Sequence, residues 1–558
     1  MTNFEKIAEL LYPNIVETPE DIENEFPKRN LPEGAKVTRL APSPTGFMHF
    51  GTLFPALVNE RLAHQSGGVF FLRIEDTDAK REVKGAEEDL INTLAFYHIN
   101  FDEGAVSGGD NGIYAPYRQS KRARIYQVYA KELIKKGLAY PCFTSEEEYE
   151  QLKESDKKTE IKNKEWTPEE VAKAREEMLA QRNITEEEVA DRLAKGNPFV
   201  IRIMANGDPE KKTPFTDLVR GKLEIPENDE DFVLLKSDGI PTYHFAHAVD
   251  DHLMGTTHVV RGEEWLPSLA KHIMLFRYLG FRLPKYLHIS QLMKMEGTSK
   301  KKLSKRDKGA ALSDYKKDGY PAESVIEYVM TLLNSNYEDW RRANPTADYS
   351  EFPFSIKKMS VSGSLFDYDK LNDVSKNVIS LMSADKVYED VTAWAKEFDE
   401  PLYQALSSDE AYAKRIFAIG RGGKKPRKDF AVWADVKPYL SFFYDSLFEA
   451  QDEIPDTHAK EDVKKALDLF MLMYDPQDDN TQWFDAIKRI ADEIGYASDM
   501  KAYKQNPDQY KGNVADVSMF LRVAVTGKMN SPDLYEVMHI IGYERTIDRI
   551  HKSIMKYV

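Results

Sequence analysis

Apolar positions near the start of the chain predict a strand, a helix and a second strand in close succession. Lys36 to Leu40 is a short β-prone run, and Val69 to Ile74 (VFFLRI) is a second apolar run of strand length. Between them, Leu53 to Gln65 carries apolar residues at helical spacing, with Pro55 in its first turn. Such a unit forms a parallel crossover and brings its first turn to the carboxyl edge of the sheet. We therefore expect an α/β fold with a ligand-binding turn at residues 41–52.

The pattern changes several times after this unit. A helix is predicted around Ala86 to Phe96, and charged, mainly helical sequence fills much of residues 117–225. Strand and helix signals resume over residues 226–295, including a long helix from Glu263 to Leu279. From about residue 374 onward, helical patterns dominate and alternating runs are few. A chain of 558 residues is too long for one hydrophobic core, so we expect three or more domains.

The turn APSPTGFMHFGT, residues 41–52, holds the first candidate chemistry. Gly46 and Gly51 allow the backbone to approach a phosphate closely, and the helix expected after Thr52 begins with free amide groups. His49 stands in the same turn. By itself, a histidine in a turn rich in proline and glycine is more often a structural loop residue.

A second candidate cluster lies about 250 residues downstream. Residues 300–308 read KKKLSKRDK, and the glycine, serine and lysine around them suit a phosphate-binding loop rather than a packed helix. Considered alone, such a charge run is usually a solvated face. The two clusters together predict an ATP site.

Several ordered motifs resemble those of the bacterial-type glutamyl-tRNA synthetases, a family of class I aminoacyl-tRNA synthetases. The motifs PSPTG, HFGT, IEDTD, LLKSDGIPTYHFAHAVDDHLMG, VVRGEEW and KLSKR occur in this order, and the resemblance extends over about residues 37–550. HFGT stands at the first class I signature and KLSKR at the second. The resemblance implies an α/β class I synthetase fold, in which a Rossmann-type nucleotide-binding fold is followed by an all-α anticodon-binding half.

The same resemblance implies a division of the chain. The expected parts are an N-terminal extension (1–36), the first half of the Rossmann-type catalytic domain (37–116), an inserted tRNA acceptor-binding domain (117–225), the second half of the catalytic domain (226–295), a connecting stem-contact region with the KLSKR loop (296–373), and an α-helical anticodon-binding domain (374–558).

The resemblance also implies an activity, that of a glutamate–tRNA ligase. Such an enzyme activates L-glutamate with ATP to glutamyl-adenylate and transfers it to the 3′-terminal ribose of tRNA-Glu, releasing AMP and diphosphate. His49 and Lys305 are the expected catalytic residues, since phosphoryl chemistry needs donors and cations, and Mg²⁺ bound to ATP would offset its charge. The expected ATP-binding residues are Gly46, His49, Gly51, Thr52, Lys302, Leu303, Ser304, Lys305 and Arg306.

For the amino acid, the family pattern implies a pocket with a cation for the side chain and an anion for the amino group. The expected residues are Arg39, Ala41, Ser43, Glu75, Tyr243, His247 and Arg261. A bidentate guanidinium at Arg39 prefers a carboxylate to an amide, which favours glutamate over glutamine. The alternatives are that Glu75 caps a helix and that Tyr243 is a core aromatic residue.

His247 departs from the family pattern, which has asparagine at this position. A histidine would offer ring nitrogens to the substrate in place of an amide. Alternatively, it forms hydrogen bonds within the fold, beside Asp250 and Asp251.

Composition limits the other possibilities. A single cysteine, Cys142, excludes an internal disulfide and a multi-cysteine zinc knuckle, so we expect no structural zinc and no metal held by the protein. The N-terminal segment is not of signal-peptide type and no stretch approaches eighteen apolar residues, so we expect a cytoplasmic enzyme without a membrane segment. Monomer is the default state of the family.

The formal net charge of −16 argues mildly against a nucleic-acid partner, but phosphate contacts need only a local basic track. One such track is residues 294–308, and the other is RGGKKPRK at residues 421–428, whose alternative interpretation is a solvated loop. In the resembling family the second track lies in the anticodon-binding half. Arg421 or Arg427 is therefore expected to read the anticodon of tRNA-Glu, and charging of tRNA-Gln with glutamate stays an open alternative.

Three other classes of protein share parts of this pattern. A glutaminyl-type synthetase would carry both signatures but a β-rich tail, and a binding-only relative would be expected to lose His49 or the SKR of the loop. A small-molecule adenylating ligase would not need the long helical part after residue 374. The helical tail and the intact signatures favour the glutamyl enzymes.

Overall fold

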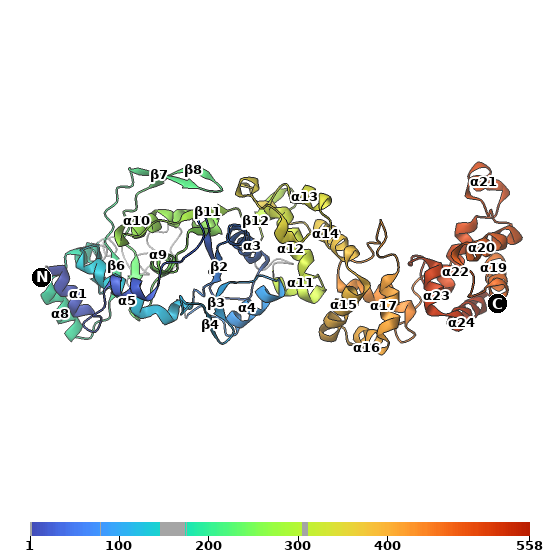
Figure 1. The fold of residues 1–558 in the computed structure, drawn as a ribbon, viewed down its shortest axis with the longest axis horizontal. Helices are drawn as coiled ribbons and strands as arrows, with labels where there is room; N and C mark the ends of the chain where they lie inside the picture. Colours follow the sequence, from blue (N-terminus) through green and yellow to red (C-terminus); the bar gives the residue numbers. More distant parts are fainter. Residues whose placement is uncertain (1–2, 79, 145–172, 174–175, 304–310, 558) are drawn as a thin grey trace. The chain divides into compact units, whose positions relative to one another are not determined.

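The computed structural model describes residues 3–78, 80–144, 173, 176–303 and 311–557. It divides into two compact units, the first formed by Met1–Ser313 and Val329–Phe366 and the second by Asp314–Tyr328 and Asp367–Val558. The first unit mixes helices and strands, whereas the second is helical (Figure 1). The predicted α/β class and the helical C-terminal half are confirmed. The finer division into six parts stays a prediction.

The first unit is built on a parallel sheet with the order β1-β2-β3-β4. β1 (Val37–Leu40) pairs in parallel with β2 (Val69–Leu72), and the crossover between them is α3 (Phe50–His64). β3 (Glu103–Val106) follows α4 (Ala86–Phe96) and pairs in parallel with β2, and β4 (Gly109–Asn111) closes the edge in an antiparallel direction. The crossover unit expected from the sequence is present.

The start of α3 differs from the prediction by three residues. The helix begins at Phe50 rather than Leu53, because His49 has an extended backbone (φ −120°, ψ 160°) and serves as the N-cap. The amide of Thr52 already donates to the carbonyl of His49 at 2.8 Å. Pro55 therefore lies inside the helix, where it lacks an amide proton, and the helix N-terminus lies at His49 rather than after Thr52.

The inserted part forms a second, antiparallel sheet. α5 (Ala123–Lys135) leads into β5 (Ala139–Cys142), and after α8 (Glu186–Ala194) the strands β6 (Val200–Ile203) and β9 (Val233–Leu235) complete the order β5-β6-β9. Between β6 and β9 runs a long hairpin of β7 (Lys212–Asp217) and β8 (Gly221–Pro226). The N-terminal helices are α1 (Asn3–Leu11), which packs on α5 and α8, and α2 (Pro19–Glu25), which packs on α5.

The catalytic fold resumes with α9 (Tyr243–Leu253), β10 (His258–Gly262) and β11 (Lys285–Ile289), the two strands pairing in parallel. The predicted long helix over Glu263 to Leu279 is instead a 3₁₀ segment, η3 (Glu263–Ser268), followed by α10 (Leu269–Leu279). Pro267 explains the difference, because it removes an amide donor from the first turns. β12 (Leu292–Glu296), β13 (Ser299–Lys302) and β14 (Ser364–Leu365) form a further small sheet.

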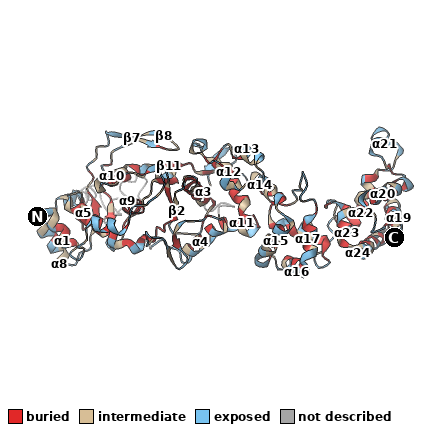
Figure 2. Ribbon diagram, viewed as in Figure 1, coloured by how far each residue is buried: buried red, intermediate tan, exposed pale blue. Residues whose placement is uncertain are grey.

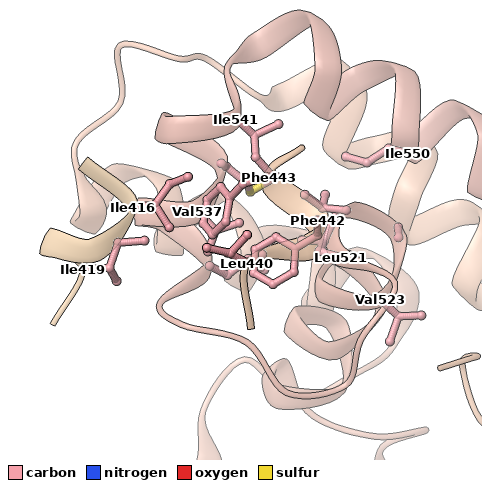
Figure 3. Packing of buried hydrophobic residues seen from close by; sticks show 14 of the residues in the cluster. Ile416, Ile419, Leu440, Phe442, Phe443, Leu521, Val523, Val537, Ile541 and Ile550 are labelled. Atoms are coloured by element: carbon pink, nitrogen blue, oxygen red, sulfur yellow. The ribbon is translucent and has the colours of Figure 1, made fainter. Parts of the chain in front are cut away.

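The second unit packs its helices around one apolar core. The helices of the chain after β13 are α11 (Leu312–Asp318), α12 (Ala322–Leu333), α13 (Tyr337–Ala343), α14 (Tyr368–Leu381), α15 (Ala384–Phe398), α16 (Glu400–Ser408), α17 (Glu410–Ala418), α18 (Val436–Leu440), α19 (Lys460–Met473), α20 (Asn480–Ile494), α21 (Met500–Gln505), α22 (Val514–Thr526), α23 (Leu534–Ile541) and α24 (Tyr543–Ile554). Buried positions recur along one face of most of these helices (Figure 2). Leu440, Phe442, Phe443 and Val537 meet in the core, with isoleucines from neighbouring helices around them (Figure 3).

Candidate active site

A cavity of about 1940 Å³ opens in the first unit beside the turn at residues 41–52. The inserted part, α9, β10 and the β12–β13 hairpin also contribute to its wall. Twelve sequence-predicted site residues line this one cavity: Arg39, Ala41, Ser43, Gly46, His49, Gly51, Thr52, Glu75, Tyr243, Arg261, Lys302 and Leu303. Residues far apart in the sequence are thus brought together, as a joint site for ATP and an amino acid requires.

His49 lies at the N-terminus of α3, the end at which the helix dipole carries partial positive charge. Gly51 follows two residues later, and a Cβ built there would lie 3.1 Å from His49 Nδ1. A side chain at this position would therefore crowd the imidazole. The arrangement suits a bound polyphosphate, since a helix N-terminus with a nearby imidazole offers several donors to one anion.

The described residues before and after positions 304–310 both lie beside the turn of the first signature. On one side, Lys302 and Leu303 line the cavity, and the amide of Leu303 donates to the carbonyl of Leu292 at 2.9 Å. On the other side, Ala311 forms an antiparallel bridge with His49, and the amide of Leu312 donates to the carbonyl of Met48 at 3.1 Å. The predicted residues Ser304, Lys305 and Arg306 lie outside the described residues.

Buried charges lie behind Arg39 and Glu75, which both line the cavity. Arg39 Nε lies 3.1 Å from Asp251 Oδ1, and Arg73 reaches the same oxygen through its NH1 at 2.7 Å. Although burial acts in the opposite direction, Arg39 and Arg73 hold the pKa of Asp251 well below its ordinary value. Arg73 NH2 also donates to Glu75 Oε1 at 3.1 Å, while burial raises the pKa of Glu75. Arg39 is therefore held rigidly by a carboxylate from α9.

Arg261 and Tyr243 also line the cavity. Arg261 donates from Nε to His288 Nε2 at 2.9 Å, and its NH1 lies 3.0 Å from His272 Nδ1. The ring of Tyr243 packs against Trp265, with 4.3 Å between the ring centroids and 35° between the ring planes. Together with Arg39, Arg261 gives the cavity two buried guanidinium groups, which are the preferred partners of carboxylates.

His247 differs from the other predicted site residues in its position. It is fully buried and does not line the cavity. Its Nε2 lies 2.9 Å from the hydroxyl of Tyr286, and its Nδ1 lies 2.8 Å from Asp251 Oδ2. Burial lowers its pKa to about 4, so the ring is neutral near pH 7. These are the contacts of the alternative interpretation, in which His247 forms hydrogen bonds within the fold.

Four side chains at or behind the site are not predicted from the sequence. Asp251 was considered only as a neighbour of His247, although an acidic pair inside the apolar helix AVDDHL is itself a signal of buried ion pairs. His272 and His288 had no signal, because they lie behind Arg261 only once β10, α10 and β11 are assembled. Trp265 stood within the motif VVRGEEW but was not singled out.

The expected anticodon residues lie in the second unit. Arg421 NH1 donates to the carbonyl of Ile379 at 2.6 Å and to that of Met382 at 3.3 Å, at the end of α14. Arg427 is exposed and forms a pair with Asp429 at 2.6 Å. Arg421 is therefore engaged in holding a helix end, whereas the surface of Arg427 and the neighbouring lysines at 424, 425 and 428 is open to solvent.

Over the parts of the chain that the structure describes, no group of three or more histidine, cysteine or acidic side chains is arranged to hold a metal ion. No helix of the described residues has the length and apolar character needed to cross a membrane.

Comparisons with known proteins show the family of the chain. The family described as "tRNA synthetases class I (E and Q), catalytic domain" matches residues 36–373, and "Anticodon binding domain" matches residues 386–554. The chain belongs to the class I tRNA synthetases for glutamate and glutamine, among the glutamate–tRNA ligases.

Relatives with this name match the chain over its length. A glutamate–tRNA ligase of Clostridium beijerinckii is 50% identical, with 99% of each chain covered, and one of Clostridium perfringens strain 13 is 48% identical over 98% of this chain and 100% of the relative. A crystal structure of a glutamate tRNA ligase from Elizabethkingia meningosepticum, in complex with its amino acid, is 27% identical, with a TM-score of 0.71, and covers 94% of this chain and 100% of that one. The resemblance drawn from the motifs is confirmed.

Proposed function

We propose that the chain activates L-glutamate with ATP and transfers it to the 3′-terminal ribose of tRNA-Glu, as a glutamate–tRNA ligase. One observation carries the proposal: Arg39 and Arg261 face the same cavity as His49 and Lys302, so two carboxylate-binding groups stand beside a polyphosphate-binding one. Glutamate has two carboxylates, and its α-carboxylate must meet the α-phosphate of ATP. The arrangement places an attacking group and an acceptor in one space.

The ATP side of the proposal uses the two signatures. His49 donates to phosphate oxygens, the positive end of the α3 dipole favours their charge, and Gly51 leaves room for the imidazole. Lys305 supplies a point charge to the developing negative charge, as the anchored flanks at Leu303 and Ala311 support. The substrate form is ATP with Mg²⁺, whose ligands would be phosphate oxygens and water.

The glutamate side uses the buried network. Arg39, held by Asp251, receives the side-chain carboxylate, and Arg261 and Tyr243 complete that end of the pocket. Glu75 receives the ammonium group, and Ala41 and Ser43 lie beside it in the same cavity wall. His247 acts behind the pocket through Asp251 rather than on the substrate.

The tRNA is proposed to bind both units. Inserted-part residues such as Phe199 and Arg202 line the cavity, which supports placing the acceptor end there. The match of the second unit to an anticodon-binding domain, with the exposed Arg427 and neighbouring lysines, supports anticodon contact. A monomer in the cytoplasm stays the expected form.

The test is aminoacylation by the full chain with labelled glutamate, and separately glutamine, on purified tRNA-Glu and tRNA-Gln. We expect glutamate on tRNA-Glu, and a loss of about 100-fold or more in His49→Ala, in line with the removal of one electrostatic donor at a reacting phosphate. His551→Ala, an exposed histidine of the second unit, is the matched control and should retain full activity. Glutamine transfer, or no transfer, would overturn the proposal. Glutamate on tRNA-Gln as well would define a relaxed enzyme.

A further inference from the structure

The turn of the β7–β8 hairpin is fixed by the carboxylate of Asp217, which is 1% exposed. Asp217 Oδ1 accepts hydrogen bonds from the amides of Val219 and Arg220 at 2.9 and 2.8 Å. The amide of Leu218 donates to the carbonyl of Tyr286 at 3.0 Å. The hairpin, which belongs to the inserted part, is therefore docked by its turn on β11 of the catalytic fold.

His288 on β11 joins this turn to the cavity wall. Its Nδ1 lies 2.7 Å from Asp217 Oδ2, and its Nε2 accepts a hydrogen bond from Arg261 Nε at 2.9 Å. A carboxylate can only accept and an arginine Nε–H can only donate, so both neighbours demand the same neutral tautomer, with the proton on Nδ1. Burial lowers the pKa of His288, which keeps the ring in that neutral form.

Two histidines bind two of the three guanidinium nitrogens of Arg261, and the third, NH2, has a different environment. Nε is bound by His288, and NH1 lies 3.0 Å from His272 Nδ1. The guanidinium lies 4.8 Å above the ring of Tyr286, and the residue is 6% exposed. NH2 is buried and has no hydrogen-bond partner among the described residues, although Arg261 lines the cavity. A buried guanidinium nitrogen of this kind is costly unless a ligand completes it.

We propose that Asp217 and His288 are positioning residues, which aim the NH2 of Arg261 at a carboxylate of the bound glutamate. The inference rests on the proposed function, since it concerns the residues that determine how Arg261 binds glutamate. Asp217 selects the tautomer of His288, His288 then offers its lone pair to Arg261 Nε, and the guanidinium is held in one orientation in the cavity wall. The hairpin of the inserted part thereby shares in building the amino-acid pocket of the catalytic fold.

Asp217→Asn tests the tautomer directly. The amide introduced by this change has one acceptor oxygen, whereas Asp217 accepts from the turn amides with one oxygen and from both the ring and the backbone amide of His288 with the other. If the oxygen stays on the turn, the NH₂ group faces His288 and forces its proton onto Nε2, where it opposes Arg261 Nε–H. We expect the KM for glutamate to rise by about 10- to 100-fold, with the KM for ATP changed less than about 3-fold.

His288→Gln and His288→Leu form the second test. The glutamine carbonyl can accept from Arg261 Nε without any tautomer, whereas leucine cannot accept at all. We expect His288→Gln to retain a glutamate KM within about 5-fold of the wild type and His288→Leu to match Asp217→Asn. In the double variant Asp217→Asn/His288→Gln, the effect of Asp217→Asn should be much smaller than it is alone, since the tautomer no longer matters.

Asp231→Asn is the matched control. Asp231 is also a buried carboxylate just outside the catalytic sheet, with Arg182, Tyr140 and the amide of Ala205 as its donors. It does not contact Arg261, so its loss should leave the glutamate KM unchanged even if stability falls. A wild-type chain that charges no tRNA with glutamate would overturn both proposals. Normal wild-type charging with an unchanged glutamate KM in Asp217→Asn, or equal KM values for His288→Gln and His288→Leu, would overturn the positioning role alone. If Asp217→Asn does not fold, the His288 pair decides.

Discussion

The two units of the chain bury different kinds of side chain. In the first unit, Arg39, Arg73, Asp250 and Asp251 are nearly or fully buried, and they are joined to one another by ion pairs. In the second unit, Arg549 is the one buried charged residue among those described, and the core is otherwise almost wholly apolar. Buried ion pairs seldom add net stability over apolar packing. The contrast indicates that the first core is arranged to position charges, and the second to hold helices together.

The largest effect is expected from Asp251→Asn. The change leaves Arg39 and Arg73 buried without their shared carboxylate, and removal of one partner of a buried pair costs about 3–5 kcal/mol. We expect the free energy of unfolding of the first unit to fall by that amount and glutamate charging to be lost. Hydrogen exchange of β1 amides, followed by mass spectrometry, measures the first effect. Unchanged protection of β1 would contradict the assigned role of the pair.

Leu467→Ala is the counterpart in the second unit. Leu467 is fully buried in α19, so the lost apolar contacts and the remaining cavity should cost about 2–5 kcal/mol. The loss should appear in the amides of α19 and α22, whereas the KM for glutamate should change less than about 2-fold, because no charged network is touched. A large rise in that KM would show that the two cores are not separable in function.

The second unit was easier to predict in structure than in function. Its helices carry apolar residues at helical spacing, and caps such as Asp367, Asp399 and Asp479 sit where the helices begin. These are local signals, so the all-helical character followed from the sequence. The hydrogen bond of Arg421 to Ile379 at the end of α14 did not, because it joins residues that are 42 positions apart in the chain, and the expected anticodon contact stays a prediction.

In the first unit the motifs predicted where the site lies, but the hydrogen-bond partners of its side chains could not be predicted from the sequence. HFGT, VVRGEEW and the start of KLSKR line one cavity, as their order suggested. The start of α3 was misplaced because an extended His49 can cap a helix without any of the usual cap side chains. The partners of Arg261 come from β11 and α10, and pairing across strands carries no local sequence signal.

The next largest effect is expected from acidification, which should lower the stability of the first unit more than that of the second. Burial lowers the pKa of His244, His247 and His258 to about 4, against an ordinary value near 6.5, and all three lie in the first unit. The unfolded chain therefore binds more protons between about pH 6.5 and 4. The stability of the first unit is complete above that window and should fall by about 1.4 kcal/mol per pH unit for each histidine within it.

In the second unit, burial raises the pKa of Asp390 and Glu536, so the same acidification favours the folded state through them. Hydrogen exchange at pH 7 and pH 5, corrected for intrinsic rates, should show a loss of protection in β10 that exceeds the loss in α22. His258→Gln should reduce the pH dependence of the stability of the first unit by the contribution of one histidine. Equal losses in both units, or no effect of His258→Gln, would refute this account.

The smallest effect is expected at the start of α20. Asp479 Oδ1 accepts from the amide of Gln482 at 2.9 Å, and Gln482 Oε1 accepts from the amide of Asp479 at 2.9 Å. Asp479→Ala removes this capping box and should cost about 1 kcal/mol, seen first as faster exchange in the opening turn of the helix. Asp485→Ala, which removes only an exposed pair with Lys488 on the same helix, should cost less than about 0.5 kcal/mol. If both changes lower the stability equally, the start of the helix is stabilised by the packing of Trp483 and Ile487 rather than by its cap. Apolar packing would then dominate the stability of the second unit even where its helices begin with polar residues.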